Sequence, residues 1–405
     1  MSQYRNNGIC YPKGFVANGI HCGIRKNKTK KDLSVIYSEV VATAAATYTQ
    51  NKVKGAPIFV TKEHLKNGLA QAMICNSGNA NTCNANGIEI ANGMSALCAK
   101  ELGIKEEDII VASTGVIGEP MSMEPFETHM KELCEGISAQ KGSDACEGIM
   151  TTDTFKKEFC ISFMLQGKEC RIGGMAKGSG MIHPNMATML AFLTSDVAID
   201  SELLNEAVHE VVNDTFNMVS VDGDTSTNDM LCMMANGLAG NQIITEKNED
   251  YEVFKAALMD ICVDISRQIA KDGEGATKLL TCIVSSAPDE QTAKAIAKSV
   301  ITSSLFKAAM FGKDANWGRI LCAIGYTDAD FDVTKIDVTL KSNQGSLPVC
   351  MNGSGCGFDE EKAEVILSED EIDILIMMHQ GEAEATAWGC DLTYDYVKIN
   401  GDYRT

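Results

Sequence analysis

Basic residues are scarce in this chain of 405 residues. It has 35 Lys and Arg against 55 Asp and Glu, which gives a formal net charge of −20 at pH 7. A net field of this sign repels a phosphate backbone, so nucleic-acid binding is disfavoured and only a local basic pocket for a small anion is left open. Hydrophobic residues make up 45% of the chain, which allows a large core and excludes a disordered protein.

Long apolar runs are missing as well. The longest, such as Met186 to Leu193, are far shorter than the roughly 20 residues that a membrane span requires. The first residues show no basic segment followed by an apolar run, the pattern typical of a signal peptide. We therefore expect a soluble protein of the cytoplasm.

Paired metal-ligand spacings are absent too. The 16 cysteines are scattered without a CxxC pair, and the closest two, Cys350 and Cys356, lack the spacing of a zinc knuckle. The six histidines form no HExxH motif. The sequence therefore predicts reduced, buried thiols and no metal site, and it argues against a non-catalytic, cysteine-rich metal-binding or storage protein.

The common nucleotide and nucleophile motifs do not fit either. In GGMAKGSG (173–180), Lys177 precedes the last glycines, unlike the lysine of a phosphate-binding loop, and it stands where a nucleophile elbow needs glycine. What remains is hydroxyl chemistry at Thr188, because a threonine at a new N-terminus can use its own α-amine as base. The residues alone leave the alternative of a simply packed threonine open.

Strand and helix patterns alternate along the chain, which predicts an α/β or α+β protein. The expected strands are 69–75, 108–112 and 159–165, with alternation from Ile336 to Leu340 and, less cleanly, from Tyr394 to Ile399. The expected helices are 88–102, 201–216 after the cap Asp200, 251–270 and one that begins after the cap Asp289. The glycine-rich segment 173–190 is expected to be a loop.

The segment 177–190 (KGSGMIHPNMATML) resembles the self-cleavage motif of the ornithine acetyltransferase family of arginine biosynthesis, the glutamate N-acetyltransferase type, which is often bifunctional. Gly401 departs from the small residue, such as alanine, expected in the family's tail. Each motif alone is weak, but together they are specific and span the chain. The further motifs, in the family's order, are 12–15 with 31–33, 76–81, 113–118, 150–154, 220–229, 273–278, 314–319 and 399–405.

The resemblance implies roles for particular residues. It implies self-cleavage between Ala187 and Thr188, with Thr188 as the nucleophile, and an oxyanion hole at Thr114 and Gly115. For each residue a plain alternative stays open, such as an ordinary turn, a solvated lysine, a helix-end acid or a frayed C-terminus. The substrate-binding residues it implies are Thr151, Lys177, Thr188, Glu274, Asn400 and Thr405.

The resemblance also implies an activity. It implies acetyl transfer from N-acetylornithine to glutamate through an acetyl-threonine ester, without a metal or an organic cofactor, and it leaves acetyl-CoA open as a further donor. The alternative is a self-cleaving N-terminal-nucleophile aminopeptidase or amidase that uses water as acceptor. Lys177, Glu274 and the tail motif favour the transferase.

The implied fold is α/β, a layered sandwich of β-sheets with flanking helices. We expect an α chain of residues 1–187 and a β chain whose two parts are 188–286 and 287–405. Two α and two β chains are expected to assemble as a heterotetramer.

Overall fold

The computed structural model of the chain describes residues 3–183 and 189–402. Within these ranges the chain packs into two compact units. Unit 1 comprises residues 3–178, 189–217 and 225–265, and unit 2 comprises residues 179–183, 218–224 and 266–402. These units describe packing. The expected boundary after 187 is a cut and the one after 286 divides the β chain, so the parts 1–187, 188–286 and 287–405 stay a prediction.

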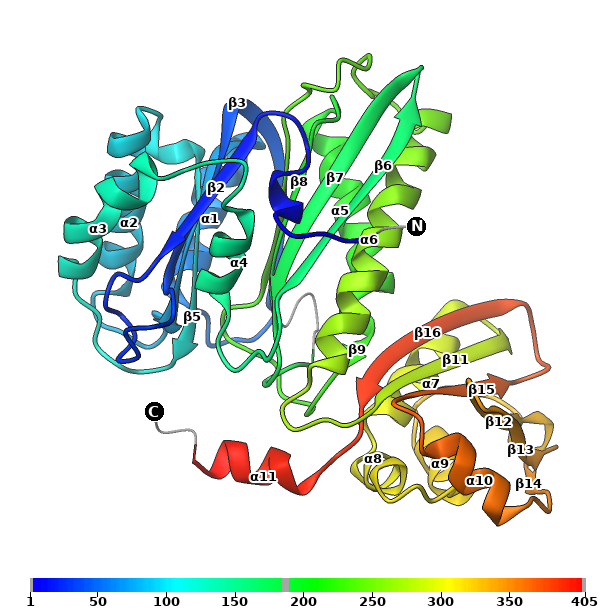
Figure 1. The fold of residues 1–405 in the computed structure, drawn as a ribbon. Coiled ribbons are helices and arrows are strands. Elements are labelled where there is room, and N and C mark those ends of the chain that lie inside the picture. The colour runs from blue at the N-terminus through cyan, green and yellow to red at the C-terminus, as the bar shows by residue number, and fades with distance from the viewer. Residues whose placement is uncertain (1–2, 184–188, 403–405) are drawn as a thin grey trace. The chain divides into compact units, whose positions relative to one another are not determined.

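Unit 1 is built on a nine-stranded mixed sheet (Figure 1). The strands lie in the order β1-β6-β7-β8-β10-β3-β4-β5, and β2 pairs with β3. The pairs β4–β5 and β8–β10 are parallel, and the others are antiparallel. The bounds are β1 (Gln3–Tyr4), β2 (Phe15–Ile20), β3 (Leu33–Tyr48), β4 (Leu69–Asn79), β5 (Ile109–Val116), β6 (Lys157–Leu165), β7 (Lys168–Lys177), β8 (Leu190–Ser195) and β10 (Met230–Ala235).

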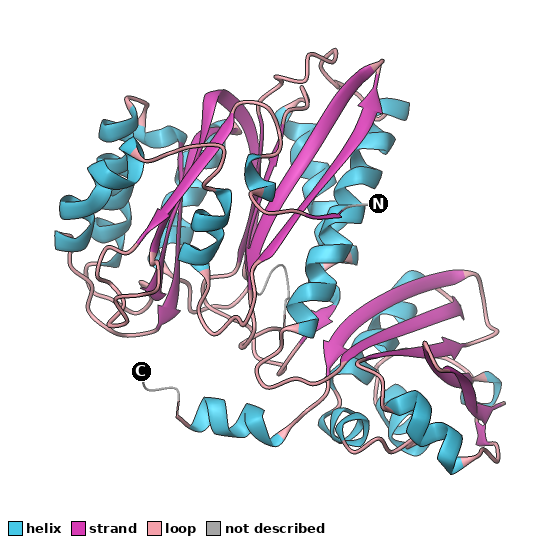
Figure 2. Cartoon of the chain, viewed as in Figure 1, coloured by secondary structure: helices cyan, strands magenta, loops and turns pink. Residues whose placement is uncertain are grey.

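Helices cover this sheet (Figure 2). Helices α1, α2 and α3 pack on one face of β4 and β5, and α5 packs on β3. Helix α6 packs on β7, where Ile261 and Ile265 lie against Gly174. The bounds are α1 (Ala56–His64), α2 (Gly87–Leu102), α3 (Glu124–Glu135), α4 (Gly142–Ile149), α5 (Ser201–Asp214) and α6 (Glu249–Lys271), with single 3-10 turns at Gly8–Cys10, Leu65–Asn67, Glu106–Asp108 and Phe216–Met218.

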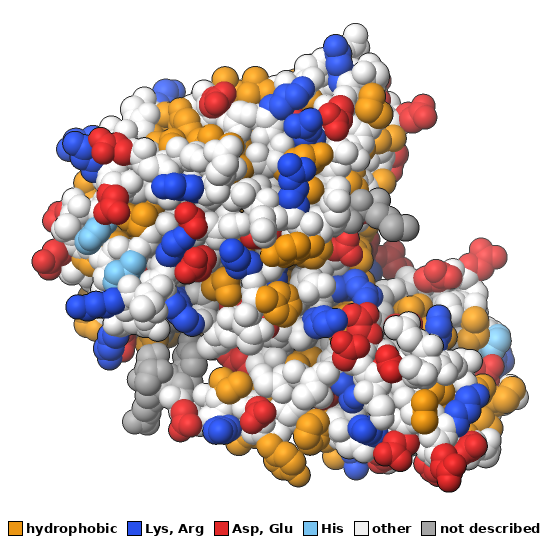
Figure 3. Space-filling view, viewed as in Figure 1, with side chains coloured by type: hydrophobic (Ala, Val, Ile, Leu, Met, Phe, Trp, Pro, Cys, Tyr) orange, Lys and Arg blue, Asp and Glu red, His pale blue; other side chains and the backbone are white. Residues whose placement is uncertain are grey.

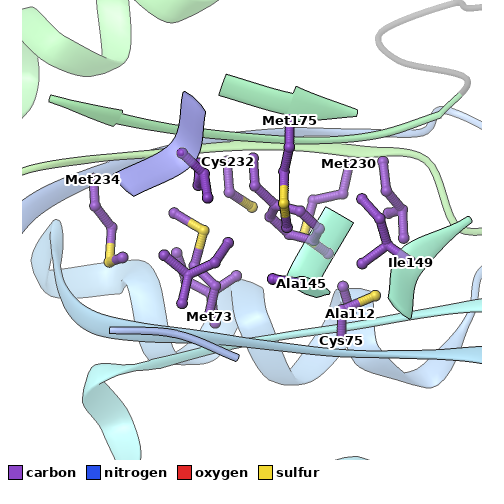
Figure 4. Packing of buried hydrophobic residues seen from close by; sticks show 14 of the residues in the cluster. Met73, Cys75, Ala112, Ala145, Ile149, Met175, Met230, Cys232 and Met234 are labelled. Atoms are coloured by element: carbon purple, nitrogen blue, oxygen red, sulfur yellow. The ribbon is translucent and has the colours of Figure 1, made fainter. Parts of the chain in front are cut away.

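The main core of unit 1 lies between two parts of the same sheet. The long strand β3 pairs along its first part with β2 and β4 and along its last part with β10, so the sheet turns over on itself. Alternate residues of β10, such as Cys232, face the same core as Met73 of β4 and Met175 of β7 (Figure 4). The expected layered α/β architecture is therefore confirmed, with α1, α2 and α3 on the outer face of β4 and β5 and α4 contributing Ala145 and Ile149 to the main core.

Unit 2 has a seven-stranded sheet of its own, in the order β14-β13-β12-β15-β11-β16-β9. Strand β11 pairs in parallel with β15 and antiparallel with β16, and α7 packs on β11 and β16. The bounds are β9 (Val219–Ser220), β11 (Leu279–Ala287), β12 (Asp337–Ser342), β13 (Gly345–Met351), β14 (Ser354–Gly355), β15 (Glu371–Met377), β16 (Ala383–Cys390), α7 (Glu290–Thr302), α8 (Ser304–Phe311), α9 (Trp317–Gly325), α10 (Glu360–Leu367) and α11 (Tyr394–Gly401), with a 3-10 turn at Val333–Lys335.

Most of the expected elements are present. The predicted strands fall in β4, β5, β6 and β12, and the predicted helices correspond to α2, α5, α6 and α7. The carboxylate of Asp200 caps α5 by accepting from the Glu202 N–H at 2.9 Å, and that of Asp289 caps α7 by accepting from the Thr292 N–H at 2.8 Å. Period and capping residues were sufficient signals for these elements.

Two expectations are wrong. The weak alternation from Tyr394 to Ile399 belongs to helix α11, because the Thr393 hydroxyl caps it by accepting from the Tyr396 N–H at 3.3 Å. The segment 173–177 is the end of strand β7, not loop. Its glycines permit close packing, since a Cβ on Gly173 would lie 2.0 Å from the Gly8 carbonyl oxygen.

The cysteines and the charged surface residues are distributed as the composition suggests. All 16 cysteines are free, and most are buried, as expected. On the face seen in Figure 3, acidic and basic side chains are interspersed, and Lys and Arg do not gather into one continuous basic surface there. Within 3–183 and 189–402, the structure has no helix long and apolar enough to cross a membrane.

Candidate active site

The predicted oxyanion residues lie at the end of a buried parallel strand. Thr114 and Gly115 belong to β5, where they pair with Ser77 and Gly78 of β4, and the Thr114 side chain is buried. A β-bulge at Asn79 interrupts the pairing directly after these residues. Bulges at strand ends often re-aim groups next to active sites, so this backbone is suited to presenting a polar group.

Gly115 occupies a position that only glycine fits. Its φ is +132°, a region that residues with a Cβ rarely adopt. A Cβ on Gly115 would also lie 2.3 Å from the Gly78 carbonyl carbon and 2.5 Å from the Asn79 nitrogen. The two strands therefore approach so closely that no side chain fits at position 115.

Asp153 organises the surroundings of two predicted substrate-binding residues. Its Oδ2 accepts from the Thr151 N–H at 2.9 Å, and its Oδ1 accepts from the Gly178 N–H at 2.7 Å, next to Lys177. Oδ1 also accepts from the Lys157 ammonium at 2.8 Å, and both of these side chains are fully buried. The structure thus brings Thr151 and Lys177 together around one carboxylate that the sequence reading missed.

The charge of Asp153 is stabilised from several sides. Burial alone would raise its pKa, but the positive charges of Lys157 and Lys177 and the hydrogen bond from the Gly178 N–H outweigh it. They hold the pKa of Asp153 well below its usual range, so the carboxylate is ionised at neutral pH. The signal in the sequence was an acid between hydroxyl residues in 150–154, with Lys157 four positions on.

Lys177 is a buried lysine whose ammonium is left without a hydrogen-bond partner in the part of the chain that the structure describes. Its side chain is 8% exposed at the end of β7, and its charge acts on Asp153 and on the Cys75 thiol. No hydrogen bond or ion pair joins its ammonium to another residue within 3–183 and 189–402. A buried ammonium with unused donors can bind the negative group of a small ligand.

Unit 2 joins Glu274 to Asn400. The Asn400 Nδ2 donates to Glu274 Oε2 at 2.8 Å and to the Tyr396 carbonyl at 3.0 Å, so the end of α11 is anchored on a buried carboxylate. A Cβ on Gly180 would lie 2.3 Å from the Glu274 carboxyl carbon, so this glycine makes room for the carboxylate. The predicted tail contact Thr405 lies outside the described residues.

The chain just before the predicted cut is held within unit 2. Asp222 accepts from the Met181 N–H at 2.6 Å and from the Ile182 N–H at 2.9 Å. The His183 ring lies 3.1 Å from the Ser220 hydroxyl. Burial, aided by the charge of Lys298 and opposed by that of Asp222, lowers the pKa of His183 to about 4. Ala187 and Thr188, the predicted cleavage residues, lie outside the described residues.

A buried hydroxyl and a glycine at a strand end, with a buried lysine in the same unit, are groups that acyl transfer from a small charged amide can use. They indicate an acyltransferase. Residues 16–405 match the ArgJ family, and the chain belongs to that family. This membership confirms the resemblance inferred from the motifs and the expected class of enzyme.

Two relatives match along almost the whole chain, and a solved structure matches over about half of it. A protein of Caldanaerobacter subterraneus subsp. tengcongensis named arginine biosynthesis bifunctional protein ArgJ is 51% identical, over 97% of this chain and 98% of its own length. A protein of Clostridium acetobutylicum named arginine biosynthesis bifunctional protein ArgJ 1 is 50% identical, over 99% of this chain and 98% of its own length. A crystal structure of the protein of that name from Bacillus halodurans is 44% identical, with a TM-score of 0.50, over 52% of this chain and 97% of that chain.

The close contact at Gly115 gives a stability prediction. Gly115→Ala should lower the free energy of unfolding by about 1–3 kcal/mol more than Gly118→Ala, because strained backbone carries costs of this order. Gly118 is the matched control, with a φ of +78° and no atom within 4 Å of an added Cβ. Urea unfolding of both variants measures the difference. Equal losses in the free energy of unfolding would show that the close β4–β5 contact does not make position 115 less tolerant of a side chain than position 118.

The lowered pKa of His183 gives a pH prediction. The unfolded chain takes up a proton near pH 6.5 that the folded chain resists until about pH 4, so this group's stabilisation is lost as pH falls between these values. The Tm of the wild type should therefore fall more from pH 7 to pH 4.5 than that of His183→Gln. His209→Gln on α5 is the control and should follow the wild type. Parallel curves of Tm against pH for the wild type and His183→Gln would contradict the lowered pKa of His183.

Proposed function

We propose that this protein transfers an acetyl group from N-acetylornithine to glutamate, as an enzyme of arginine biosynthesis. The observation that carries the proposal is the match of residues 16–405 to the ArgJ family. It is supported by relatives that bear the name arginine biosynthesis bifunctional protein along almost their entire length. It is also supported by the grouping of Thr151 and Lys177 around Asp153, and of Glu274 with Asn400.

The proposed reaction begins with self-cleavage between Ala187 and Thr188. The cut frees the α-amine of Thr188, whose ordinary pKa of about 7.7–8.0 leaves a neutral fraction that can act as base near neutral pH. The Bacillus halodurans chain is matched over 97% of its length yet covers only 52% of this chain. Such coverage is what one of two fragments of similar length would give, and it supports the proposed cut.

The acetyl group then moves in two half-reactions. The Thr188 hydroxyl oxygen attacks the acetyl carbonyl carbon while the α-amine takes its proton. The carbon–nitrogen bond breaks, and the amine of ornithine leaves with that proton. The amine of glutamate next attacks the carbonyl carbon of the acetyl-threonine ester and gives its proton to the Thr188 α-amine. The new carbon–nitrogen bond forms N-acetylglutamate, the carbon–oxygen bond breaks, and the α-amine returns the proton to the Thr188 oxygen. Thr114 and Gly115 would stabilise the oxyanion in both steps, because Gly115 has no side chain to shield its N–H and Thr114 supplies a hydroxyl.

The buried charges suit a zwitterionic amino acid. Lys177 would bind the substrate carboxylate, and Glu274 would bind the side-chain amine of ornithine. Thr151, Asn400 and Thr405 would add hydrogen bonds. The reaction requires no metal and no organic cofactor, since the ester itself stores the acetyl group. The word bifunctional in the relatives' names supports acetyl-CoA as a second donor. The α2β2 heterotetramer and a cytoplasmic location belong to the same proposal.

One experiment separates the transferase from a hydrolase that uses water. The purified protein is given N-acetylornithine with and without glutamate, and ornithine and N-acetylglutamate are measured. The transferase releases ornithine faster as glutamate is added, with parallel lines in a double-reciprocal plot, the pattern of a ping-pong reaction. Ornithine release that ignores glutamate, with free acetate as product, would favour the aminopeptidase or amidase. Acetyl-CoA as sole donor tests the second activity.

The hydroxyl of Thr188 is expected to serve both cleavage and transfer. Thr188→Ala should remain one uncut chain without transfer activity, and Thr188→Ser should be cut at least in part, because it retains a hydroxyl. Denaturing electrophoresis and mass spectrometry of the fragments give the readout. A Thr188→Ala chain still cut after Ala187 would refute this role.

Asn400 is expected to affect substrate binding and not self-cleavage. Asn400→Ala removes the hydrogen bond to Glu274 and the proposed hydrogen bond to substrate. It should raise the KM for N-acetylornithine about tenfold, the size of one lost charge-assisted hydrogen bond. Self-cleavage needs no substrate and should proceed normally. Lys398→Ala, an exposed change on the same helix, is the control and should keep the wild-type KM. An unchanged KM in Asn400→Ala would show that the tail does not contact substrate.

A further inference from the structure

A second buried group, the carboxamide of Asn228, contacts the backbone that carries the predicted oxyanion hole. Its side chain is 6% exposed, and its Nδ2 donates to the Ala80 carbonyl at 2.5 Å and to the Ser113 carbonyl at 3.0 Å. Its Oδ1 accepts from the hydroxyls of Thr82 and Thr227, both at 2.6 Å. Both donor hydrogens and both acceptor positions of the amide are thus used, which fixes its orientation.

The Ser113 carbonyl belongs to the peptide group that leads directly into Thr114. A hydrogen bond to this oxygen fixes the plane of the Ser113–Thr114 peptide, and with it the orientation of the Thr114 backbone. On the other side of Thr114, the contact of Gly115 with Gly78 fixes the backbone. The backbone is therefore fixed on both sides of Thr114. On the N-terminal side, the hydrogen bond from Asn228 fixes it.

The segment that carries Asn228 is itself tied down by polar contacts with earlier parts of unit 1. The Thr49 hydroxyl donates to the Ser226 carbonyl at 2.8 Å, and the Gly55 N–H donates to the Thr227 carbonyl at 3.0 Å. A Cβ on Gly55 would lie 2.4 Å from Asn228 Nδ2, so a glycine there leaves space for the amide. Asn228 follows the predicted cut and Ser113 precedes it, so the amide would join the two fragments.

We propose that Asn228 is a positioning residue for acetyl transfer, whose carboxamide holds the Ser113–Thr114 peptide in the orientation that the oxyanion hole requires. This inference rests on the proposed function of Thr114 and Gly115. Asn228 touches neither substrate nor nucleophile in this role and acts through the β5 backbone. Its loss should slow the chemical step and leave substrate binding nearly unchanged, because misplacement of a catalytic group costs rate.

Asn228→Asp tests the proposal with little change in volume. It replaces the donor Nδ2 by an oxygen that faces two carbonyl oxygens, so the Ser113–Thr114 peptide loses its hydrogen bond. Asn241→Asp is the matched control, a buried amide whose Nδ2 donates to the Ala198 and Gln242 carbonyls at 3.0 and 2.8 Å. For both variants kcat, the KM for N-acetylornithine, the rate of acetyl-enzyme formation and Tm are measured on the cleaved protein.

We expect Asn228→Asp to lower kcat and the rate of acetyl-enzyme formation roughly 10- to 100-fold with KM little changed, the effect of small misplacements. Asn241→Asp should lower Tm and retain the wild-type kcat. Equal kcat values in the two variants, in an active wild type, would overturn the inference alone. A wild type without acetyl transfer would refute the proposed function, and this inference with it.

A second, milder variant tests the proposal if Asn228→Asp does not fold or is not cleaved. Thr82→Val combined with Thr227→Val removes the two hydroxyl donors to Oδ1 and leaves Asn228 in place. Freed from these contacts, the amide can rotate, and kcat should fall several-fold, on the scale of a slightly misplaced group. A folded, cleaved double variant with the wild-type kcat would overturn the inference.

Discussion

The buried carboxylate of Asp153 determines how the end of β7 meets the segment around Thr151. It accepts hydrogen bonds from two backbone N–H groups that are far apart in sequence, and its charge is matched by Lys157. A buried ion of this kind is costly unless its partners are complete, so the geometry around it has little freedom. Lys177 is thereby placed with its cation balanced at a distance by Asp153 but without a hydrogen-bond partner in the described chain.

A similar demand for complete polar pairing recurs elsewhere. In unit 1 the amide of Asn228 satisfies two carbonyls at the ends of β4 and β5, and in unit 2 the amide of Asn400 satisfies the buried Glu274. Strands β8 and β10, both after the predicted cut, pair with β7 and β3, both before it. A cut between 187 and 188 would therefore leave two fragments that share one sheet and one hydrophobic core.

The sequence allowed prediction of the repeating parts of the fold and of the motif residues, because periodicity and caps are local signals. It did not show Asp153 or Asn228 as organising residues, since the Gly178 partner of Asp153 lies 25 positions away and the Ala80 partner of Asn228 lies 148 positions away, and no spacing rule links such pairs. The strand assigned to Tyr394–Ile399 failed because a few alternating residues fit a short capped helix equally well. At 173–177, glycines that permit close strand packing were taken for loop glycines.

The central claim is a covalent acetyl-threonine at residue 188, and mass spectrometry of the protein tests it directly. The cleaved protein is incubated with N-acetylornithine alone, quenched in acid and digested. The account predicts one added acetyl group on the peptide that begins at Thr188, and its loss within one turnover when glutamate is added. An uncut chain, or a Thr188 peptide that never carries acetyl while ornithine is released, would contradict it.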